Sequence, residues 1–241
     1  MKLAHYALDG MTKVGVVDEG RIIDVNDGAT KLGLSGFMQS ASIDSILEQG
    51  LIDELRQVES KIASLGGGYR LESVGLLTPI IKPEKILLVA VNYHSHGREQ
   101  NVKPPSEPYF FTKMGNALIG PDQPVLVLRV SHEADWEVEL AVIIGKTGKY
   151  ISRKEALNYV AGYTVSNDIS FRDFQFWKKS PEKLSNLGLD WVKGKSLDSS
   201  FPLGPWLVTR DQISDPHNLA ISLSVNGVTS SVPTLPILSS R

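Results

Sequence analysis

The segment from Trp136 to Ile144 starts with a strict alternation of apolar and polar residues. The apolar residues of one parity are Trp136, Val138, Leu140, Val142 and Ile144. Glu137 and Glu139 share the other parity. A period of two predicts a β-strand whose apolar face lies in a core. The two carboxylates would then point the same way, about 7 Å apart along the strand.

Like charges side by side on a half-buried strand repel each other, and desolvation strengthens the repulsion. The alternation therefore predicts a compensating partner for Glu137 and Glu139. A divalent cation is one such partner, because oxygen-rich sites suit hard ions such as Mg²⁺ and Ca²⁺. The alternative is an outer face on which both glutamates are simply solvated.

The rest of the pattern predicts a mostly β chain with few helices. Residues 2–26 contain three apolar stretches separated by turn residues, which predicts a β-meander. His5 within it is expected to be an ordinary strand residue. Apolar residues at helical spacing predict a helix over 51–65, ended by the glycines at 66–68. Further strands are predicted at 85–91, 109–113, 125–130, 160–165 and 219–225, and the first of them is expected to be buried on both faces.

A polar run with two histidines follows the strand predicted at 85–91. His96 and Glu99 are three residues apart, so one helical turn would pair them, and such a pair can orient a water or act as a general base. The alternative is a surface turn with an incidental ion pair. His94 and His96 also form a His-x-His pattern, which could bind zinc on a strand. The glycine and polar residues around them disfavour a strand there.

Charged residues also end or follow other predicted strands. Lys113 ends the strand at 109–113. Asp168 follows the strand at 160–165, where its carboxylate could complete a metal site with the two glutamates. Lys195 follows a glycine among apolar residues and is a candidate for holding an anionic oxygen. Asp135 shares the parity of the glutamates and is a candidate for supporting them.

The composition narrows the class of protein. A chain of 241 residues with 41% hydrophobic and 22% charged residues is typical of a globular protein. The net charge of −2 indicates neither a nucleic-acid nor a membrane partner. Because the chain has no cysteine, disulfides, thiolate catalysis and cysteine-based zinc sites are excluded. No signal or transit pattern and no long apolar run is present, which predicts a cytoplasmic protein with the mitochondrial matrix as the alternative.

Four motifs together resemble one known family. They are Tyr93-x-x-His96-x-x-Glu99, Glu137-x-Glu139, the segment from Gly162 to Asp173 that contains Asn167-Asp168 and Ser170-x-Arg172-Asp173, and the segment from Gly194-Lys195-Ser196 to Gly204-Pro205-Trp206. Their order and spacing resemble the fumarylacetoacetate hydrolase family, most nearly its short members of the domain-containing-protein-2 and 2-hydroxyhepta-2,4-diene-1,7-dioate isomerase type.

The resemblance implies an α+β fold that is mostly β, with a mixed β-roll and a small N-terminal α/β domain. It implies a cation, Mg²⁺ or alternatively Ca²⁺ or Mn²⁺, held by Glu137, Glu139 and Asp168. The predicted division of the chain is a small N-terminal domain of meander and helix at 1–70, a linker at 71–80, a catalytic domain at 81–228 and a divergent tail at 229–241. In the tail we expect no return strand after Asn226-Gly227, so the C-terminal part of the roll is predicted to be missing.

The resemblance also implies a chemistry. His96 and Glu99 would activate water on a lid, Lys195 would contact a substrate oxygen, and Lys113 would be a further substrate-binding lysine. The expected enzyme is a metal-dependent hydrolase, decarboxylase or isomerase that acts on a small 2-oxo or 2,4-dioxo acid through an enolate, in a homodimer. The alternatives are an inactive truncated pseudoenzyme that acts as a dimerisation partner, and a His-x-His zinc hydrolase.

Overall fold

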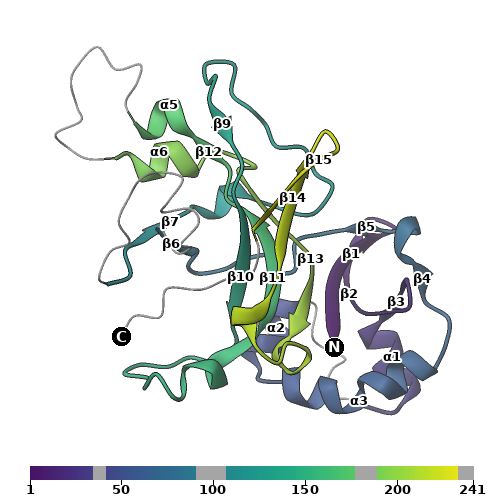
Figure 1. Cartoon of the computed structure of the whole chain (residues 1–241). Helices are drawn as coiled ribbons and strands as arrows, with labels where there is room; N and C mark the ends of the chain where they lie inside the picture. Colours follow the sequence, from purple (N-terminus) through teal and green to yellow (C-terminus); the bar gives the residue numbers. More distant parts are fainter. Residues whose placement is uncertain (35–41, 91–106, 177–188, 233–241) are drawn as a thin grey trace.

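A twisted sheet forms the centre of this computed structural model, which describes residues 1–34, 42–90, 107–176 and 189–232 (Figure 1). Within these ranges the sheet has nine strands. Its main path runs through β10 (Val138–Ile144), β11 (Val160–Asn167), β13 (Phe201–Thr209), β1 (Lys2–Leu8), β2 (Met11–Asp18), β3 (Arg21–Asp24) and β4 (Tyr69–Arg70). β5 (Gly75–Leu76) pairs with β1, and β8 (Leu118–Ile119) pairs with β13. The β8–β13 pair is parallel and the others are antiparallel, so the mixed, mostly β, α+β fold is confirmed.

Three two-stranded pairs and short helices complete the described structure. The pairs are β6 (Leu87–Val89) with β7 (Phe110–Thr112), β9 (Ala134–Asp135) with β12 (Ser170–Phe171), and β14 (Ile221–Val225) with β15 (Val228–Val232). The α-helices are α1 (Val25–Lys31), α2 (Ile43–Glu48), α3 (Ile52–Ser64), α5 (Arg172–Gln175) and α6 (Trp191–Lys195). Single 3₁₀ turns lie at Leu71–Ser73, Gly115–Ala117, Ala156–Tyr159, Arg210–Gln212 and Pro216–Asn218. No helix in the described ranges is long and apolar enough to cross a membrane.

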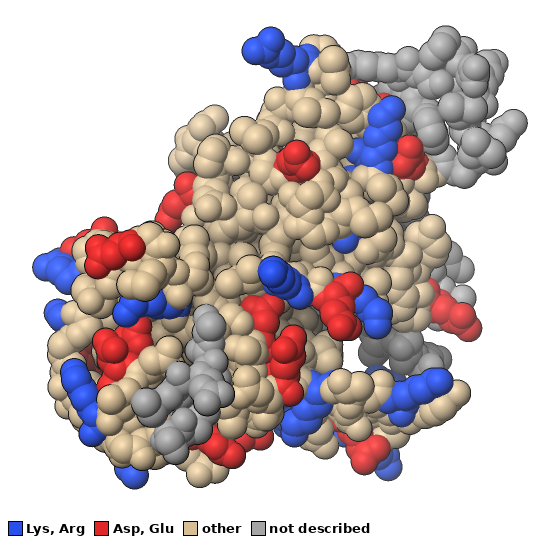
Figure 2. All heavy atoms as spheres, turned by 180° about the vertical axis from the view of Figure 1, so that it is seen from behind, with Lys and Arg blue, Asp and Glu red and all other residues tan. Residues whose placement is uncertain are grey.

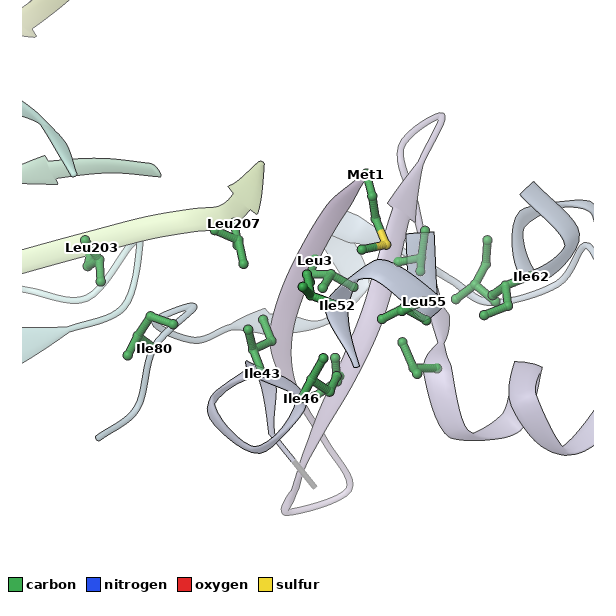
Figure 3. Close-up of a cluster of buried hydrophobic side chains, with 14 of the residues drawn as sticks. Met1, Leu3, Ile43, Ile46, Ile52, Leu55, Ile62, Ile80, Leu203 and Leu207 are labelled. Atoms are coloured by element: carbon green, nitrogen blue, oxygen red, sulfur yellow. The ribbon is translucent and has the colours of Figure 1, made fainter. Parts of the chain in front are cut away.

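The main core lies between the sheet and the N-terminal helices. Figure 3 shows side chains of α2 and α3 that face Leu3 of β1 and Leu207 of β13. Strand β1 joins the N-terminal meander to β13 in one sheet, because its Leu3 is paired with Leu207. The predicted meander and helix are both confirmed. The division into residues 1–70, 71–80 and 81–228 stays a prediction.

Three expectations about individual strands are wrong. Residues 125–130 form no strand, and the Leu126 N–H donates to Ser199 Oγ at 2.7 Å instead of to a neighbouring strand. Strand β6 is not buried on both faces, because Leu87 is 60% exposed. A return strand does follow Asn226-Gly227, since β14 and β15 form a hairpin around that turn. A missing C-terminal part of the roll is not confirmed.

His5 has a structural role that the sequence pattern did not indicate. Its ring is fully buried on β1, and Nδ1 lies 3.0 Å from the carbonyl oxygen of Thr78. The Ile43 N–H donates to Nε2 at 2.8 Å, at the start of α2. These partners require a neutral ring with its proton on Nδ1. The ring therefore joins β1, the segment at Thr78 and α2.

This contact predicts a pH-dependent stability. Burial lowers the pKa of His5 below 6.5, so on acidification the unfolded chain binds a proton before the folded chain does. The contribution of His5 is fully present above pH 6.5 and is lost as the pH falls towards the lowered pKa. Urea unfolding should give a lower free energy at about pH 5.5 than at about pH 7.5, and His5→Gln should reduce this difference. Equal pH dependence in wild type and His5→Gln, with the exposed His217→Gln as control, would contradict the assignment.

Candidate active site

Two acidic residues are placed side by side by the pairing of β10 with β11. Asp168 directly follows β11, and its N–H donates to the carbonyl oxygen of Glu137 at 2.8 Å. The Glu137 N–H donates in turn to Asn167 Oδ1 at 3.0 Å. The backbone thus holds both carboxylates at one end of the sheet, near α5, α6 and the β6–β7 pair (Figure 1).

The side chain of Lys195 lies between these two carboxylates. Its Nζ donates to Glu137 Oε2 at 2.6 Å and to Asp168 Oδ2 at 2.5 Å. Lys195 is the last residue of α6, a helix that begins where the Asp190 side chain accepts from the Lys193 N–H. The ammonium also lies 4.9 Å from the centre of the Phe111 ring, on β7. Both lysine and carboxylates are shielded from water, which strengthens their interaction.

A second buried lysine approaches Asp168 from the other side. Lys113 directly follows β7, as predicted, and its Nζ donates to Asp168 Oδ1 at 2.7 Å and to the Ile169 carbonyl oxygen at 3.0 Å. Its side chain is fully buried in the ion pair. The two oxygens of Asp168 are therefore each bound by a different lysine.

Arg172 holds Glu137 in the same manner. As the first residue of α5, it donates through Nη2 to Glu137 Oε1 at 2.7 Å, and through Nε and Nη2 to Asp135 Oδ2 at 3.0 Å and 2.8 Å. Asp135 thus supports Glu137 indirectly, through the guanidinium. Arg172 stands in one of the family motifs, but neither its spacing nor its neighbours in the sequence indicated this contact.

The negative charge of Glu137 is compensated by cationic side chains of the protein itself. Burial alone would raise the pKa of the Glu137 carboxyl, but the charges of Lys195 and Arg172 outweigh burial and lower this pKa to about 2. Burial lowers the pKa of the Lys113 ammonium to about 8, although Asp168 acts in the opposite direction. Glu137 is therefore ionised at neutral pH, and Lys113 can release a proton under weakly alkaline conditions.

Glu139 lies two residues beyond Glu137 on β10, opposite Ser166 of β11. The glutamates share a face with Ala141 and Ile143, which pack against the main core. The expectation that the apolar face lies in a core holds for Val138 and Leu140, which pack on Ile221 of β14. It is wrong for Val142 and Ile144, which are 47% and 62% exposed.

The expected metal ligands are brought together in part. Glu137 and Asp168 converge on one ammonium, and within the described ranges no three His, Asp or Glu side chains are grouped so that they could hold a metal ion. The donor chemistry nevertheless fits a hard cation, since both converging groups are carboxylates. The participation of Glu139 stays a prediction. His94, His96 and Glu99 lie outside the described residues.

Comparison with known proteins shows to which family the chain belongs. The family model for the fumarylacetoacetate (FAA) hydrolase C-terminal domain matches residues 85–235. The chain belongs to the fumarylacetoacetate hydrolase family. The match includes Glu137, Asp168, Lys113, Lys195 and Arg172, so the whole ionic cluster lies in the part that defines the family.

Named relatives and solved structures agree with this membership. The mitochondrial oxaloacetate tautomerase fahd2 of Xenopus laevis is 39% identical over 212 residues, covering 87% of this chain and 61% of the relative. The 2,4-didehydro-3-deoxy-L-rhamnonate hydrolase of Sphingomonas sp. (strain SKA58) is 34% identical over 94% of this chain and 70% of its own. The maleylpyruvate hydrolase of Sphingobium sp. SYK-6, solved with manganese(II) and pyruvate, has a TM-score of 0.73 at 28% identity and covers 99% of this chain and 78% of that one. The chain thus spans less than two thirds of the Xenopus tautomerase.

Proposed function

We propose that this chain is a divalent-cation-dependent enzyme that converts a small 2-oxo acid through an enolate, with keto–enol tautomerisation of oxaloacetate as the first candidate reaction. The observation that carries the proposal is the convergence of Glu137 and Asp168 within a cluster of three cationic side chains. Burying several charges costs desolvation free energy that their pairing offsets only in part, so a buried ion-pair cluster is a weak stabiliser of a fold. Such a cluster is therefore more typical of a functional site.

The charges of the cluster suit a dianionic 2-oxo acid bound together with a divalent cation. The ligand and the cation carry opposite charges of equal size, so together they add no net charge to the buried site. Glu137, Asp168 and, by our proposal, Glu139 would hold Mg²⁺, Mn²⁺ or Ca²⁺. A cation at this place would polarise the 2-oxo group of the substrate and stabilise negative charge on its oxygen.

The protein residues have distinct proposed roles. Lys195 places positive charge where the substrate oxygen gains negative charge. Lys113, whose Nζ donates to Asp168 Oδ1, is proposed to bind the substrate. Arg172 positions Glu137 and does not itself react. His96 and Glu99 are proposed to handle the proton or the water at the carbon atom.

The tautomerase assignment draws on the relatives at 39–47% identity that are named oxaloacetate tautomerases. Hydrolysis of a 2,4-dioxo or acylpyruvate-type acid is the second candidate, since the 34% relative and the maleylpyruvate hydrolase are named hydrolases. An inactive pseudoenzyme is not favoured, because the ionic cluster is intact and the relatives are named enzymes. The mitochondrial names of the tautomerases make the mitochondrial matrix our preferred location.

The test is a rate measurement on the purified 241-residue chain. We expect conversion of enol-oxaloacetate to the keto form to be accelerated with Mg²⁺ or Mn²⁺ and abolished by EDTA, then restored by adding the metal back. Decarboxylation of oxaloacetate and hydrolysis of maleylpyruvate are measured in parallel, and the fastest reaction decides the reaction type. Equal rates with EDTA and with metal would contradict the proposal.

We also propose that the chain forms a homodimer. In the described part of the sheet, β10 is an edge strand, and its Val142 and Ile144 are 47% and 62% exposed. Exposed apolar residues on an edge strand favour association. Light scattering at micromolar concentration should give twice the chain mass of 26.4 kDa, and a monomer mass would contradict this proposal.

A further inference from the structure

The ammonium of Lys195 occupies the point on which two carboxylates converge. Its Nζ is 2.6 Å from Glu137 Oε2 and 2.5 Å from Asp168 Oδ2. Hard cations bind carboxylate oxygens at similar separations, about 2.3–2.6 Å for Ca²⁺ and about 2.0–2.1 Å for Mg²⁺. A cation bound to these same two oxygens would therefore need the space that the ammonium fills.

The other contacts of the two carboxylates do not depend on Lys195. Arg172 binds the second oxygen of Glu137, and Lys113 binds the second oxygen of Asp168. If the ammonium moved away, each carboxylate would keep one strong hydrogen bond and its orientation. The oxygens that face the shared point could then bind another cation, and Glu137 Oε2 would keep its 3.4 Å contact with the Ser170 hydroxyl. Lys195 itself has a flexible four-carbon stem, which allows such a movement.

We propose that Lys195 and the divalent cation exchange at this point, so that the lysine is an internal competitor of the metal. This inference rests on the proposed function, because it needs the metal site of Glu137 and Asp168. The displaced ammonium remains beside the site and is then available to the anionic oxygens of the substrate. The exchange therefore orders the reaction, with the cation bound before the 2-oxo acid.

Lys113 provides a matched control for the test. It carries the same charge as Lys195, is also buried and also binds Asp168, but it does not contact Glu137 in the described hydrogen bonds. Loss of either lysine removes one positive charge near the bound cation and so reduces the electrostatic repulsion between lysine and cation. Loss of Lys195 alone would also remove the group that fills the shared point.

The experiment measures Mg²⁺ affinity of the full chain by isothermal titration calorimetry, without substrate. Lys195→Met is expected to bind Mg²⁺ at least about tenfold more tightly than Lys113→Met, because no charge-assisted hydrogen bonds to the shared oxygens must be broken. Equal affinities in the two variants, or weaker binding by Lys195→Met, would overturn the exchange while leaving the metal site intact. No Mg²⁺ binding by wild type or either variant would overturn the exchange together with the proposed function.

A second measurement uses the wild-type chain and so does not depend on folding of the variants. The ammonium signals of Lys195 and Lys113 are followed by ¹H–¹⁵N NMR during a Mg²⁺ titration. The Lys195 signal should shift or broaden in step with binding and by more than the Lys113 signal, because Lys113 keeps its bonds to Asp168 Oδ1 and to the Ile169 carbonyl oxygen. A Lys195 signal that stays unchanged when the calorimetric site is saturated would overturn the proposal.

Discussion

Replacing Asp168 with asparagine is expected to lower turnover by about 10³-fold or more and to destabilise the fold by about 3–5 kcal/mol. The loss of activity is expected because one of the two carboxylates that converge on the shared point disappears. The loss of stability is expected because two buried lysines, Lys113 and Lys195, would each lose a charged partner. Initial rates with saturating Mg²⁺ and urea unfolding curves measure the two effects.

The control for this substitution is Asp53→Asn. Asp53 also forms an ion pair, with Arg56 on α3, but its side chain is 58% exposed. A surface pair contributes about 0–1 kcal/mol, so both rate and stability should stay near wild type. If Asp168→Asn retained more than about a tenth of the activity, the place of Asp168 in the site would be wrong.

Replacing Gly194 with alanine is expected to lower turnover by about 10²-fold while the chain stays folded. A Cβ at position 194 would lie 2.5 Å from Cβ and 2.8 Å from Cα of Gln175. Helices α5 and α6 would have to separate, because carbon atoms need about 3.5–4.0 Å. The separation would move Lys195 and Arg172 apart, since they lie on these two helices. The rate of oxaloacetate conversion and the circular dichroism spectrum measure the two parts of this expectation.

Gly75→Ala is the matched control for a glycine replacement. A Cβ at position 75 would meet the side chain of Ala7 at 3.8 Å, an ordinary van der Waals contact. Activity close to wild type is expected there. Equal activity of Gly194→Ala and Gly75→Ala would show that the close packing of α5 on α6 does not position the site.

Local patterns in the sequence predicted the meander and several of the other strands, because these depend on turn residues and short-range alternation. The β1–β2–β3 meander and the helix over 51–65 follow from signals within a few residues. The orientation of β10 was not predictable in this way. Its apolar parity suggested the buried face, whereas the main core lies on the glutamate side, and that depends on where the N-terminal helices pack.

The candidate site was predictable in part for the same reason. Asp168 was found because it follows a strand, whereas the role of Lys113 was implied by the family resemblance; the structure brings the two side chains to 2.7 Å. Arg172 was missed as a partner of Glu137, because the contact requires α5 to turn back beside β10. The residues 125–130 were predicted as a strand from composition alone, but no neighbouring strand in the described chain pairs with them.

Crystallography of the chain with Mn²⁺ tests most directly whether acidic side chains from two neighbouring strands hold one hard cation. The anomalous signal of manganese locates the ion independently of any assay. We predict a single strong peak in contact with carboxylate oxygens of Glu137, Glu139 and Asp168, with Lys195 Nζ withdrawn from between Glu137 and Asp168. A saturated crystal in which the peak lies elsewhere, with Lys195 still bound to both carboxylates, would contradict the account.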